Sequence, residues 1–331
     1  MSKYKGYIGS YTRRKSTGIR SFSFNQDNFT TDDFLKVENP TYLALSRDKN
    51  YLYSSMSRGN LSGVLSLNLK TLTKKELLFD NEATPCYVSR YDNTLLASNY
   101  HQGNFDIYSL KSGMLKERII SINHKGSGPN IDRQESSHVH FSEKSPLTDD
   151  IFVTDLGSDK VYVYDANFKR KTEINFNAGS GPRHIAFHSE KKFLYVFTEL
   201  SNEVYKVDYS IDDYIITDSI YTLDKEKSSK SDGAAIRISN DNRFLYVSNR
   251  GNNSISILDI SDANSMSLVD IISTEGDHPR DFNITPDGKY LLAANMNTDN
   301  LVLFGVDKES GKLKLIKSDI YSPEPVSIVF L

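Results

Sequence analysis

One phrase of sequence returns six times along this 331-residue chain: a short apolar strand, a polar turn, and a second strand that ends in a polar residue. Clear copies are PTYLALSRDKNYLYS, PRHIAFHSEKKFLYVFTE and PRDFNITPDGKYLLAAN. The residues that anchor the successive repeats are Pro40, Pro85, Ser136, Pro182, Gly233, Pro279 and Pro325. Their spacings are 45, 51, 46, 51, 46 and 46 residues. A regular period of this length is typical of a β-propeller.

The last repeat is incomplete, because only PVSIVFL follows before the chain ends at Leu331. Its missing strands stand at the other end of the chain, where YKGYIGSYT resembles the second strand of the phrase and GIRSFSF the third. We therefore predict an all-β, seven-bladed β-propeller in which N- and C-terminal strands complete one blade. Such closure removes the exposed sheet edges of an open ring. Because a closed ring buries one continuous core, residues 1–331 are expected to form a single domain.

Composition and charge exclude several classes of function. The 40 basic and 43 acidic side chains give a net charge of −3, unlike that of a strongly basic nucleic-acid-binding protein. No apolar run approaches the roughly 20 residues of a membrane span, and the N-terminus lacks the apolar core of a signal peptide. The single cysteine, Cys86, excludes an internal disulfide and is expected to be a small buried residue of an inner strand. We therefore expect a cytoplasmic protein that binds neither nucleic acid nor membranes.

Motifs of several common enzyme classes are absent from the sequence. It contains no GxGxxG after a strand, no Walker sequence and no GxSxG elbow. The histidines are spread over different repeats, without the spacing of a zinc or calcium site. We therefore expect neither a cofactor nor a metal, and the oligomeric state is left open.

The candidate site lies where the start of each first strand meets the end of each second strand. These points share one face of the ring, so polar groups from separate blades surround the mouth of the central channel. The first strands contribute His138, Arg183, His184 and Arg280 near their start. The second strands contribute Asn99, Asp155, Glu199, Asn249, Arg250 and Asn295 at their ends.

The concentration of arginine at this mouth favours an anionic ligand, because a planar guanidinium recognises carboxylate or phosphate through paired hydrogen bonds. Arg183 and Arg280 follow proline at the same repeat position, and Arg237 is expected to lie slightly deeper in the channel. Glu199 and Arg250 occupy equivalent positions in neighbouring repeats. They form either a structural ion pair or two separate contacts with a ligand.

Other polar residues at the mouth have simpler structural interpretations. His140 alternates with His138 and is either a channel residue or a buried histidine bound to the backbone. Tyr11 and Tyr100, which share the repeat position of Glu199, either stack on a sugar or pack the rim. Short polar side chains at strand ends commonly bind turns through the backbone. This interpretation is preferred for Asn99, Asp155, Asn249 and Asn295.

Four segments resemble the seven-bladed lactonase family, which includes propeller-type bacterial 6-phosphogluconolactonases and fungal carboxymuconate lactonizing enzymes. The segments are HKGSGPNIDRQESSHVHF, GPRHIAFHSEKKFLYVFTELSNEV, AAIRISNDNRFLYVSNRGNNSI and HPRDFNITPDGKYLLAANMNTDNL. The first is the most specific, since a generic propeller has no reason to contain RQE followed by HVH. The likeness covers essentially the whole chain, from GYIGSYT to PVSIVF.

The resemblance implies active residues at the matching positions. The histidine after RQE, the arginine of GPRH, the glutamate of TEL and the arginine of SNRG correspond to His138, Arg183, Glu199 and Arg250. Both histidines of HVH fit the motif, so His140 is the alternative to His138. The implied reaction is hydrolysis of a sugar-phosphate lactone, 6-phosphogluconolactone of the pentose phosphate pathway.

A mechanism consistent with these residues needs no covalent intermediate. His138, alone or with Glu199, removes a proton from the attacking water. Arg250 or Arg183 stabilises the charge that grows on the carbonyl oxygen. The substrate-binding residues are Arg133 and Arg280, which hold the 6-phosphate, together with His140 and Arg237.

Two other functions remain open. A cycloisomerase would use the same histidine and glutamate to move a proton while the arginines bind the carboxylates of a muconate, so only the substrate separates it from a lactonase. A non-catalytic propeller that serves as a protein-binding platform would present apolar or aromatic residues at its rim, whereas this rim is polar and cationic.

Overall fold

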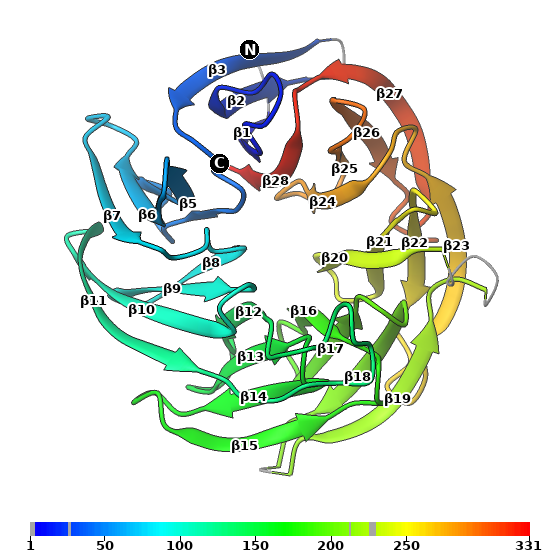
Figure 1. The fold of residues 1–331 in the computed structure, drawn as a ribbon. Coiled ribbons are helices and arrows are strands. Elements are labelled where there is room, and N and C mark those ends of the chain that lie inside the picture. Colours follow the sequence, from blue (N-terminus) through cyan, green and yellow to red (C-terminus); the bar gives the residue numbers. More distant parts are fainter. Residues whose placement is uncertain (1–3, 26–27, 212, 225–229) are drawn as a thin grey trace.

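A computed structural model describes residues 4–25, 28–211, 213–224 and 230–331 of the protein. In this part of the chain, 28 strands form seven four-stranded antiparallel sheets around a central channel (Figure 1). None of the described residues belongs to a helix long and apolar enough to cross a membrane. The prediction of an all-β, seven-bladed propeller is confirmed.

Each blade consists of four strands that follow one another outward from the channel. The innermost strands are β28 (Pro325–Phe330), β4 (Leu43–Leu45), β8 (Tyr87–Tyr91), β12 (Val139–Lys144), β16 (Pro182–Phe187), β20 (Asp232–Ile238) and β24 (Pro279–Ile284). The second strands are β1 (Tyr4–Ser10), β5 (Tyr51–Arg58), β9 (Thr94–Asn99), β13 (Ile151–Asp155), β17 (Phe193–Thr198), β21 (Phe244–Arg250) and β25 (Tyr290–Asn295). The third strands are β2 (Gly18–Phe24), β6 (Leu61–Asn68), β10 (Asn104–Lys111), β14 (Lys160–Tyr164), β18 (Glu203–Asp208), β22 (Ser254–Asp259) and β26 (Asn300–Val306). The outermost strands are β3 (Phe29–Lys36), β7 (Lys74–Asp80), β11 (Met114–Asn123), β15 (Arg170–Asn175), β19 (Ile215–Tyr221), β23 (Ser267–Ser273) and β27 (Leu313–Tyr321).

One blade combines a strand from near each end of the chain. The C-terminal strand β28 pairs antiparallel with the N-terminal strand β1, so that Gly6 lies opposite Phe330 and Ile8 opposite Ile328. Figure 1 shows β28, in red, between the channel and the blue strand β1. The predicted closure by both termini is therefore confirmed.

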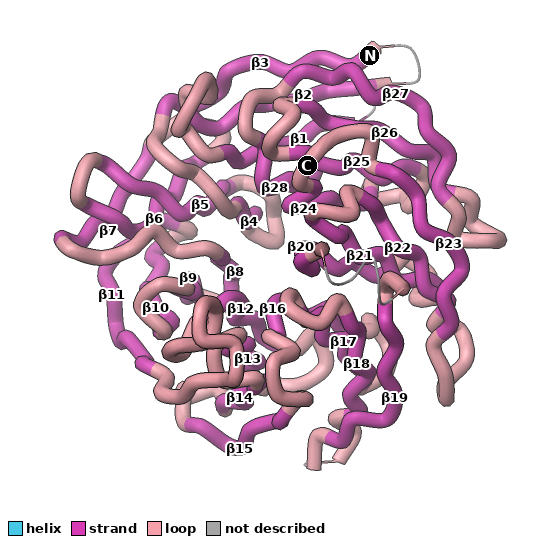
Figure 2. The backbone as a smooth tube through the Cα atoms, turned by 45° about the vertical axis from the view of Figure 1, so that its right-hand side comes forward, coloured by secondary structure: helices cyan, strands magenta, loops and turns pink. Residues whose placement is uncertain are grey.

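The core lies between neighbouring sheets. Phe152 of one blade packs in the same cluster as Val196 and Tyr205 of the next, and each of these side chains is at most 3% exposed. Second and third strands are covered on both faces, which explains continuous apolar runs such as FLYVF in β17. The outermost strands have one face in water and alternate between exposed and half-buried residues, as in β19. Figure 2 shows strands around the full ring, joined by loops.

Five of the seven described innermost strands carry a β-bulge near the end where they begin. At each bulge the inner strand holds an extra residue that has no partner on the second strand, and such a residue is aimed differently from its neighbours. The extra residues are Val326, His140, Arg183, Ala234 with Ala235, and Arg280. Val326, His140, Arg183 and Arg280 lie at the mouth of the channel, whereas Ala235 packs in the core.

The strand register corrects one predicted repeat anchor. In the blade of β12, the strand pair begins at Val139, which takes the place that Pro182 has in the next blade. The predicted anchor Ser136 is therefore wrong by three residues, because the segment before Val139 is a loop. His140 is consequently the equivalent of Arg183.

Candidate functional site

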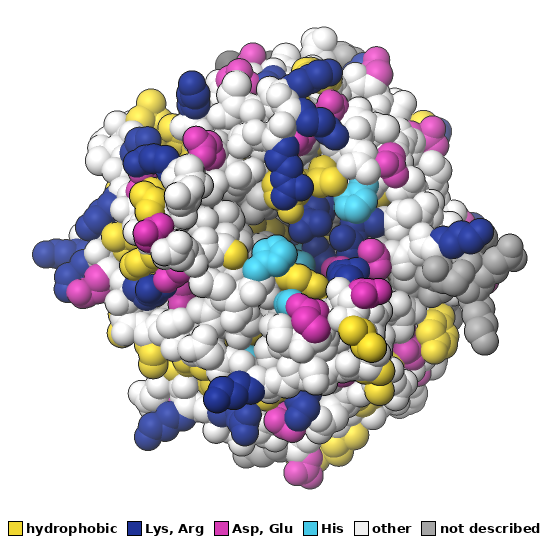
Figure 3. All heavy atoms as spheres, in the orientation of Figure 1, with side chains coloured by type: hydrophobic (Ala, Val, Ile, Leu, Met, Phe, Trp, Pro, Cys, Tyr) yellow, Lys and Arg dark blue, Asp and Glu magenta, His cyan; other side chains and the backbone are white. Residues whose placement is uncertain are grey.

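A cavity of about 380 Å³ opens at the channel end where the innermost strands begin. In Figure 3 it appears as a central hollow that contains basic side chains, with histidine at its rim. Among the described residues that line it there are five arginines and one acidic residue, Glu199. The arginines are Arg13, Arg133, Arg183, Arg250 and Arg280. The cavity is therefore strongly cationic.

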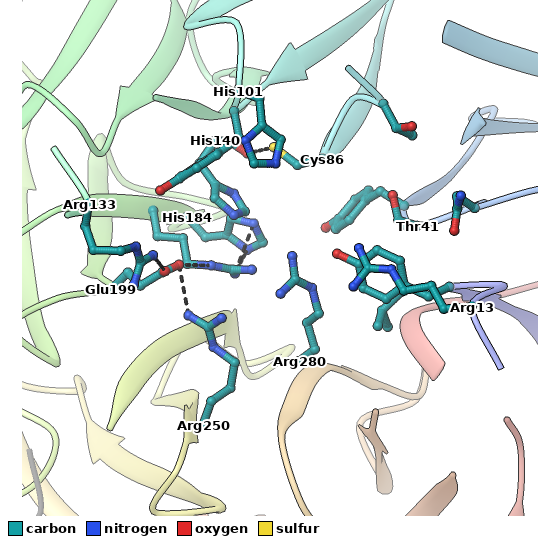
Figure 4. A pocket seen from close by; sticks show the side chains of 17 residues that line it. Arg13, Thr41, Cys86, His101, Arg133, His140, His184, Glu199, Arg250 and Arg280 are labelled. Carbon is teal, nitrogen blue, oxygen red and sulfur yellow. Dashed lines mark hydrogen bonds and ion pairs between the residues drawn. The ribbon is translucent and has the colours of Figure 1, made fainter. Parts of the chain in front are cut away.

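Three arginines share the carboxylate of Glu199, which follows directly after β17. Arg183 Nε lies 2.8 Å and Arg250 Nη2 2.9 Å from Oε2, while Arg133 Nη2 binds Oε1 (Figure 4). Glu199 is only 3% exposed. Burial by itself would raise its pKa, but the charges of Arg250 and Arg183 hold the pKa well below 4.5. Glu199 is therefore ionised and a weak base.

The backbone of β20 fixes Arg183, which belongs to the preceding blade, and Arg250, which belongs to the same blade. Arg183 Nη1 donates to Ala234 O, and Arg250 Nη2 donates to Gly233 O, both at 2.7 Å. These acceptors lie in β20, where a Cβ atom on Gly233 would come within 2.7 Å of Thr198 O. Burial, helped by the charge of Arg250, lowers the pKa of Arg183 to about 10. Both guanidinium groups thus keep a fixed orientation, and Arg183 stays protonated at neutral pH.

A buried anchor positions the loop that carries Arg133. Gln134 is fully buried, and its Nε2 donates to Asp159 Oδ1 at 2.8 Å. Asp159 also accepts two backbone N–H groups of the loop before β16, at 2.7 and 2.8 Å. One carboxylate therefore ties together the loops that precede His140 and Arg183.

The structure does not place His138 on the cavity. Its ring stacks on Tyr100 with the centroids 4.2 Å apart, and its Nδ1 lies 2.9 Å from Tyr100 O. Its Nε2 lies 3.1 Å from a carboxylate oxygen of Glu135. Both ring nitrogens are thus engaged by neighbouring residues, and His138 itself does not line the cavity. The expected position of His138 at the channel mouth is corrected, because the bulge in β12 turns the next alternate residue, His140, inward.

His140 lines the cavity instead. Its side chain is 4% exposed, and its Nδ1 has no hydrogen-bond partner among the described residues, so the interpretation of a histidine bound to the backbone is wrong. Its ring meets that of His184 with 5.1 Å between the centroids. Burial and the charge of Arg183 lower the pKa of both histidines well below 6.5. His140 is therefore a neutral imidazole that can accept a proton.

Arg237 does not line the cavity, although it was predicted to bind substrate. Its Nη2 pairs with Asp281 Oδ1 at 2.9 Å and lies 3.5 Å from the hydroxyl of Tyr42. Asp281 is 2% exposed and Tyr42 lines the cavity. The prediction is corrected, because an ion pair behind a wall residue engages the charge of Arg237.

The loop after β1 supplies one wall of the cavity, of which the repeats predicted Tyr11 but not Arg13. Tyr11 lines the cavity, and the guanidinium carbons of Arg13 and Arg280 lie 3.9 and 5.6 Å from the centroid of its ring. Arg13 was missed because it lies outside the repeated phrase. Cys86 also lines the cavity. It packs against the core as a half-buried residue directly before β8, so the predicted full burial within an inner strand is corrected.

Polar residues at the strand ends mostly bind turns, as predicted. Asn99 and Asn295 donate to backbone carbonyls at 2.7 and 2.8 Å, and Asp155 accepts three backbone N–H groups. Asn249 differs, because it bonds to the hydroxyl groups of neighbouring side chains such as Ser256, at 2.9 Å. In the described part of the chain, no group of three or more His, Cys, Asp or Glu side chains is arranged to hold a metal ion.

Comparison with known proteins identifies the family. Residues 5–330 match the family described as "Lactonase, 7-bladed beta-propeller". The chain belongs to the seven-bladed β-propeller lactonase family. This lactonase is 36% identical over 348 residues to the 6-phosphogluconolactonase of Bacillus subtilis strain 168, with 100% of this chain and 99% of the relative covered.

Solved structures agree over the whole length of the lactonase. A protein from Lactobacillus plantarum superimposes with a TM-score of 0.93 and 32% identity, covering 100% of both chains. The periplasmic gluconolactonase of Pseudomonas aeruginosa superimposes with a TM-score of 0.89 and 25% identity, covering 99% of both chains. The protein is therefore an enzyme that hydrolyses a lactone. Its cavity offers a neutral imidazole beside fixed guanidinium groups, which are the two components that this reaction needs.

Proposed function

We propose that this lactonase hydrolyses 6-phosphogluconolactone to 6-phosphogluconate, a step of the pentose phosphate pathway. The main observation that supports this proposal is the positive charge of the cavity. Among its described lining residues, five guanidinium groups face one carboxylate. The histidines in its wall, His101, His140 and His184, have pKa values lowered by burial and add no positive charge at pH 7. Such an excess of positive charge favours a phosphorylated substrate over a neutral one. The name of the Bacillus subtilis relative supports the same substrate.

His140 acts as the general base in the proposed mechanism. It accepts a proton from water as the water oxygen attacks the lactone carbonyl carbon. When the tetrahedral intermediate collapses, the bond between this carbon and the ring oxygen breaks. The protonated imidazole then returns its proton to the departing ring oxygen, which becomes a hydroxyl group. The imidazole is neutral again at the end of the cycle.

Arg183 and Arg250 stabilise the oxyanion. Nη2 of Arg183 and Nη1 of Arg250 form no hydrogen bond with a described residue. Nε and Nη1 of Arg183 and Nη2 of Arg250 bind Glu199 and the backbone of β20. Donors held in advance are effective because they need no reorganisation as charge develops on the carbonyl oxygen. Glu199 holds the two guanidinium groups and takes no proton itself.

The substrate is tested by steady-state kinetics. We expect kcat/KM for 6-phosphogluconolactone to exceed that for glucono-δ-lactone by about 100-fold or more, since the phosphate forms charge-assisted hydrogen bonds. Both lactones hydrolyse in water, so the uncatalysed rate is subtracted at each pH. Equal values would contradict the phosphorylated substrate and indicate a general sugar lactonase. Turnover of a carboxymuconate in place of both would indicate the cycloisomerase.

A further inference from the structure

The arginines around Glu199 differ from those on the other side of the cavity in how far their charge is offset. Arg133, Arg183 and Arg250 all pair with Glu199. Arg133 also lies 3.7 Å from the carboxylate of Asp232. Arg133 was predicted to hold the phosphate, but these two carboxylates already neutralise much of its charge.

Arg280 and Arg13 have no acidic partner among the described residues. Arg280 is the extra residue of the bulge in β24, and Figure 4 shows its guanidinium group pointing into the cavity. The same figure shows Arg13 on the side of the cavity away from Glu199. Both guanidinium groups approach the ring of Tyr11, at 5.6 and 3.9 Å from its centroid. Two uncompensated cations thus lie around one aromatic ring in the cavity wall.

The loop that carries Tyr11 and Arg13 is held in place by the C-terminal end of the chain. Glu324, which directly precedes β28, is 3% exposed. Its carboxylate accepts the backbone N–H groups of Arg13, Arg14, Lys15 and Ser16 at 3.2, 2.8, 3.1 and 3.3 Å. A loop fixed in this way loses little conformational freedom when a ligand binds. Arg13 is therefore presented by a rigid backbone.

We propose that Arg280 and Arg13, arranged around Tyr11, form the subsite that holds the phosphate of the substrate. The inference rests on the proposed function and adds the orientation of the substrate. With the phosphate at the Tyr11 wall, the lactone carbonyl lies on the other side of the cavity, beside His140, Arg183 and Arg250. The closing blade, through Tyr11 and Arg13, and the blade of β24, through Arg280, thus determine specificity for a phosphorylated lactone, while the blades of β12, β16 and β20 carry out the chemistry.

A neighbouring groove is less suited to a phosphate. It is lined by Lys230, Asp232, Arg250 and His278 among others. The carboxylate of Asp232 opposes an anion there, and burial together with the charge of Arg250 lowers the pKa of His278 to about 4, so that this imidazole is neutral. Of the two arrangements, only the Tyr11 wall offers two guanidinium groups that form no ion pair with a carboxylate of the described residues.

The experiment compares Arg280→Gln and Arg13→Gln with Arg47→Gln, a control that removes one charge from an exposed turn between β4 and β5. We expect Arg280→Gln to raise KM for 6-phosphogluconolactone about 10- to 100-fold and Arg13→Gln, which is more exposed, about 3- to 10-fold. We expect kcat, and both constants for glucono-δ-lactone, to change less than about threefold. Arg47→Gln should match the wild type. Calorimetric titration with 6-phosphogluconate and with gluconate gives a readout that does not depend on turnover.

The outcomes separate this inference from the proposed function. A wild type that binds 6-phosphogluconate no more tightly than gluconate, and hydrolyses both lactones equally, overturns the proposed substrate and the subsite with it. If the wild type prefers the phosphorylated compounds and the Arg280→Gln and Arg13→Gln variants keep this preference in full, the subsite alone is overturned. If Arg280→Gln fails to fold, Arg280→Lys and Arg13→Gln decide the matter, because each should weaken the preference in a folded protein.

Discussion

Glu199 and Arg250 occupy equivalent positions in neighbouring blades, and their side chains form an ion pair with 2.9 Å between Oε2 and Nη2. Both are buried, at 3% and 7% exposed. Since Glu199 also binds Arg183 and Arg133, one carboxylate serves three guanidinium groups. The pair is therefore both structural and functional, because the contact that holds the arginines together also directs them at the cavity.

Glu199→Gln should lower both stability and activity. Removing one partner of a buried ion pair leaves uncompensated charge, here on three arginines, and costs about 3 kcal/mol of unfolding free energy. We expect the double variant with Arg250→Gln to recover part of this loss, as coupled residues do. Urea denaturation and kcat/KM are measured on the single and double variants. Unchanged unfolding midpoints in both single variants would contradict the network.

The same carboxylate predicts how stability depends on pH. The pKa of Glu199 is held well below 4.5 in the folded protein, so its ionised form stabilises the fold. This contribution is complete above the unfolded pKa of about 4.5 and is lost as pH falls toward the folded value. The wild type should therefore lose stability below about pH 4.5 more steeply than Glu199→Gln. If both proteins lose stability equally steeply as pH falls, the ionised carboxylate of Glu199 does not stabilise the fold.

Arg250→Lys should not preserve activity. Arg250 Nη2 binds Glu199 and Gly233 O at the same time, and a single ammonium group on a flexible stem does not reproduce this planar arrangement. We expect kcat/KM to fall about 10²–10³-fold, the range for loss of one oxyanion donor. Melting curves recorded alongside the kinetics report whether the loss arises from unfolding. A lysine variant with wild-type kcat/KM would mean that charge alone suffices.

His140→Ala should lower kcat about 10²–10⁴-fold, the range for a positioned general base. Because burial and Arg183 lower the pKa of His140 well below 6.5, the imidazole stays neutral and active as pH falls through 6.5. The plateau of kcat/KM against pH should therefore extend below pH 6.5. Arg183→Gln removes a charge that lowers this pKa, so the acidic limb should move to higher pH.

His138→Ala is the matched control for His140→Ala. Its ring packs on Tyr100 and pairs with Glu135, so we expect reduced stability and a smaller loss of kcat. A large loss of kcat in His138→Ala, with normal turnover in His140→Ala, would exchange the two roles. Wild-type kcat in both would exclude a histidine mechanism.

Deletion of residues 325–331 should abolish cooperative unfolding. The deletion removes β28 and leaves β1 as an unpaired edge next to the channel. Exposed edges favour aggregation. Light scattering and a thermal unfolding curve test this expectation, which fails if the truncated chain melts like the full protein.

The repeated phrase was sufficient to predict the number of blades, the closure by both termini, and the convergence of Arg183, Glu199, Arg250 and Arg280 on one mouth. Each of these follows from repeat period and from strand direction. Which histidine faces the cavity could not be predicted, because it depends on a bulge. In HVHF both histidines are on the same side of an ideal strand, and only the register between Val139 and Asp155 separates them.

Two further features depend on contacts between distant parts of the chain. The place of Arg13 is set by the carboxylate of Glu324, more than 300 residues later. Arg237 is engaged by Asp281 from the next blade. Neither contact leaves a local pattern in the sequence. The residues of the cavity wall were therefore predicted only where they occupy a repeat position.

The bulges give this propeller a way to change its chemistry without changing its architecture. The extra residue of each bulge stands outside the ladder of strand pairing, so its replacement does not disturb the hydrogen bonds of the blade. Four of these bulge positions line the cavity, with polar groups at His140, Arg183 and Arg280 and an apolar one at Val326. Relatives that share the fold can differ in substrate through substitutions at a few of these positions, and an engineer can address one blade at a time.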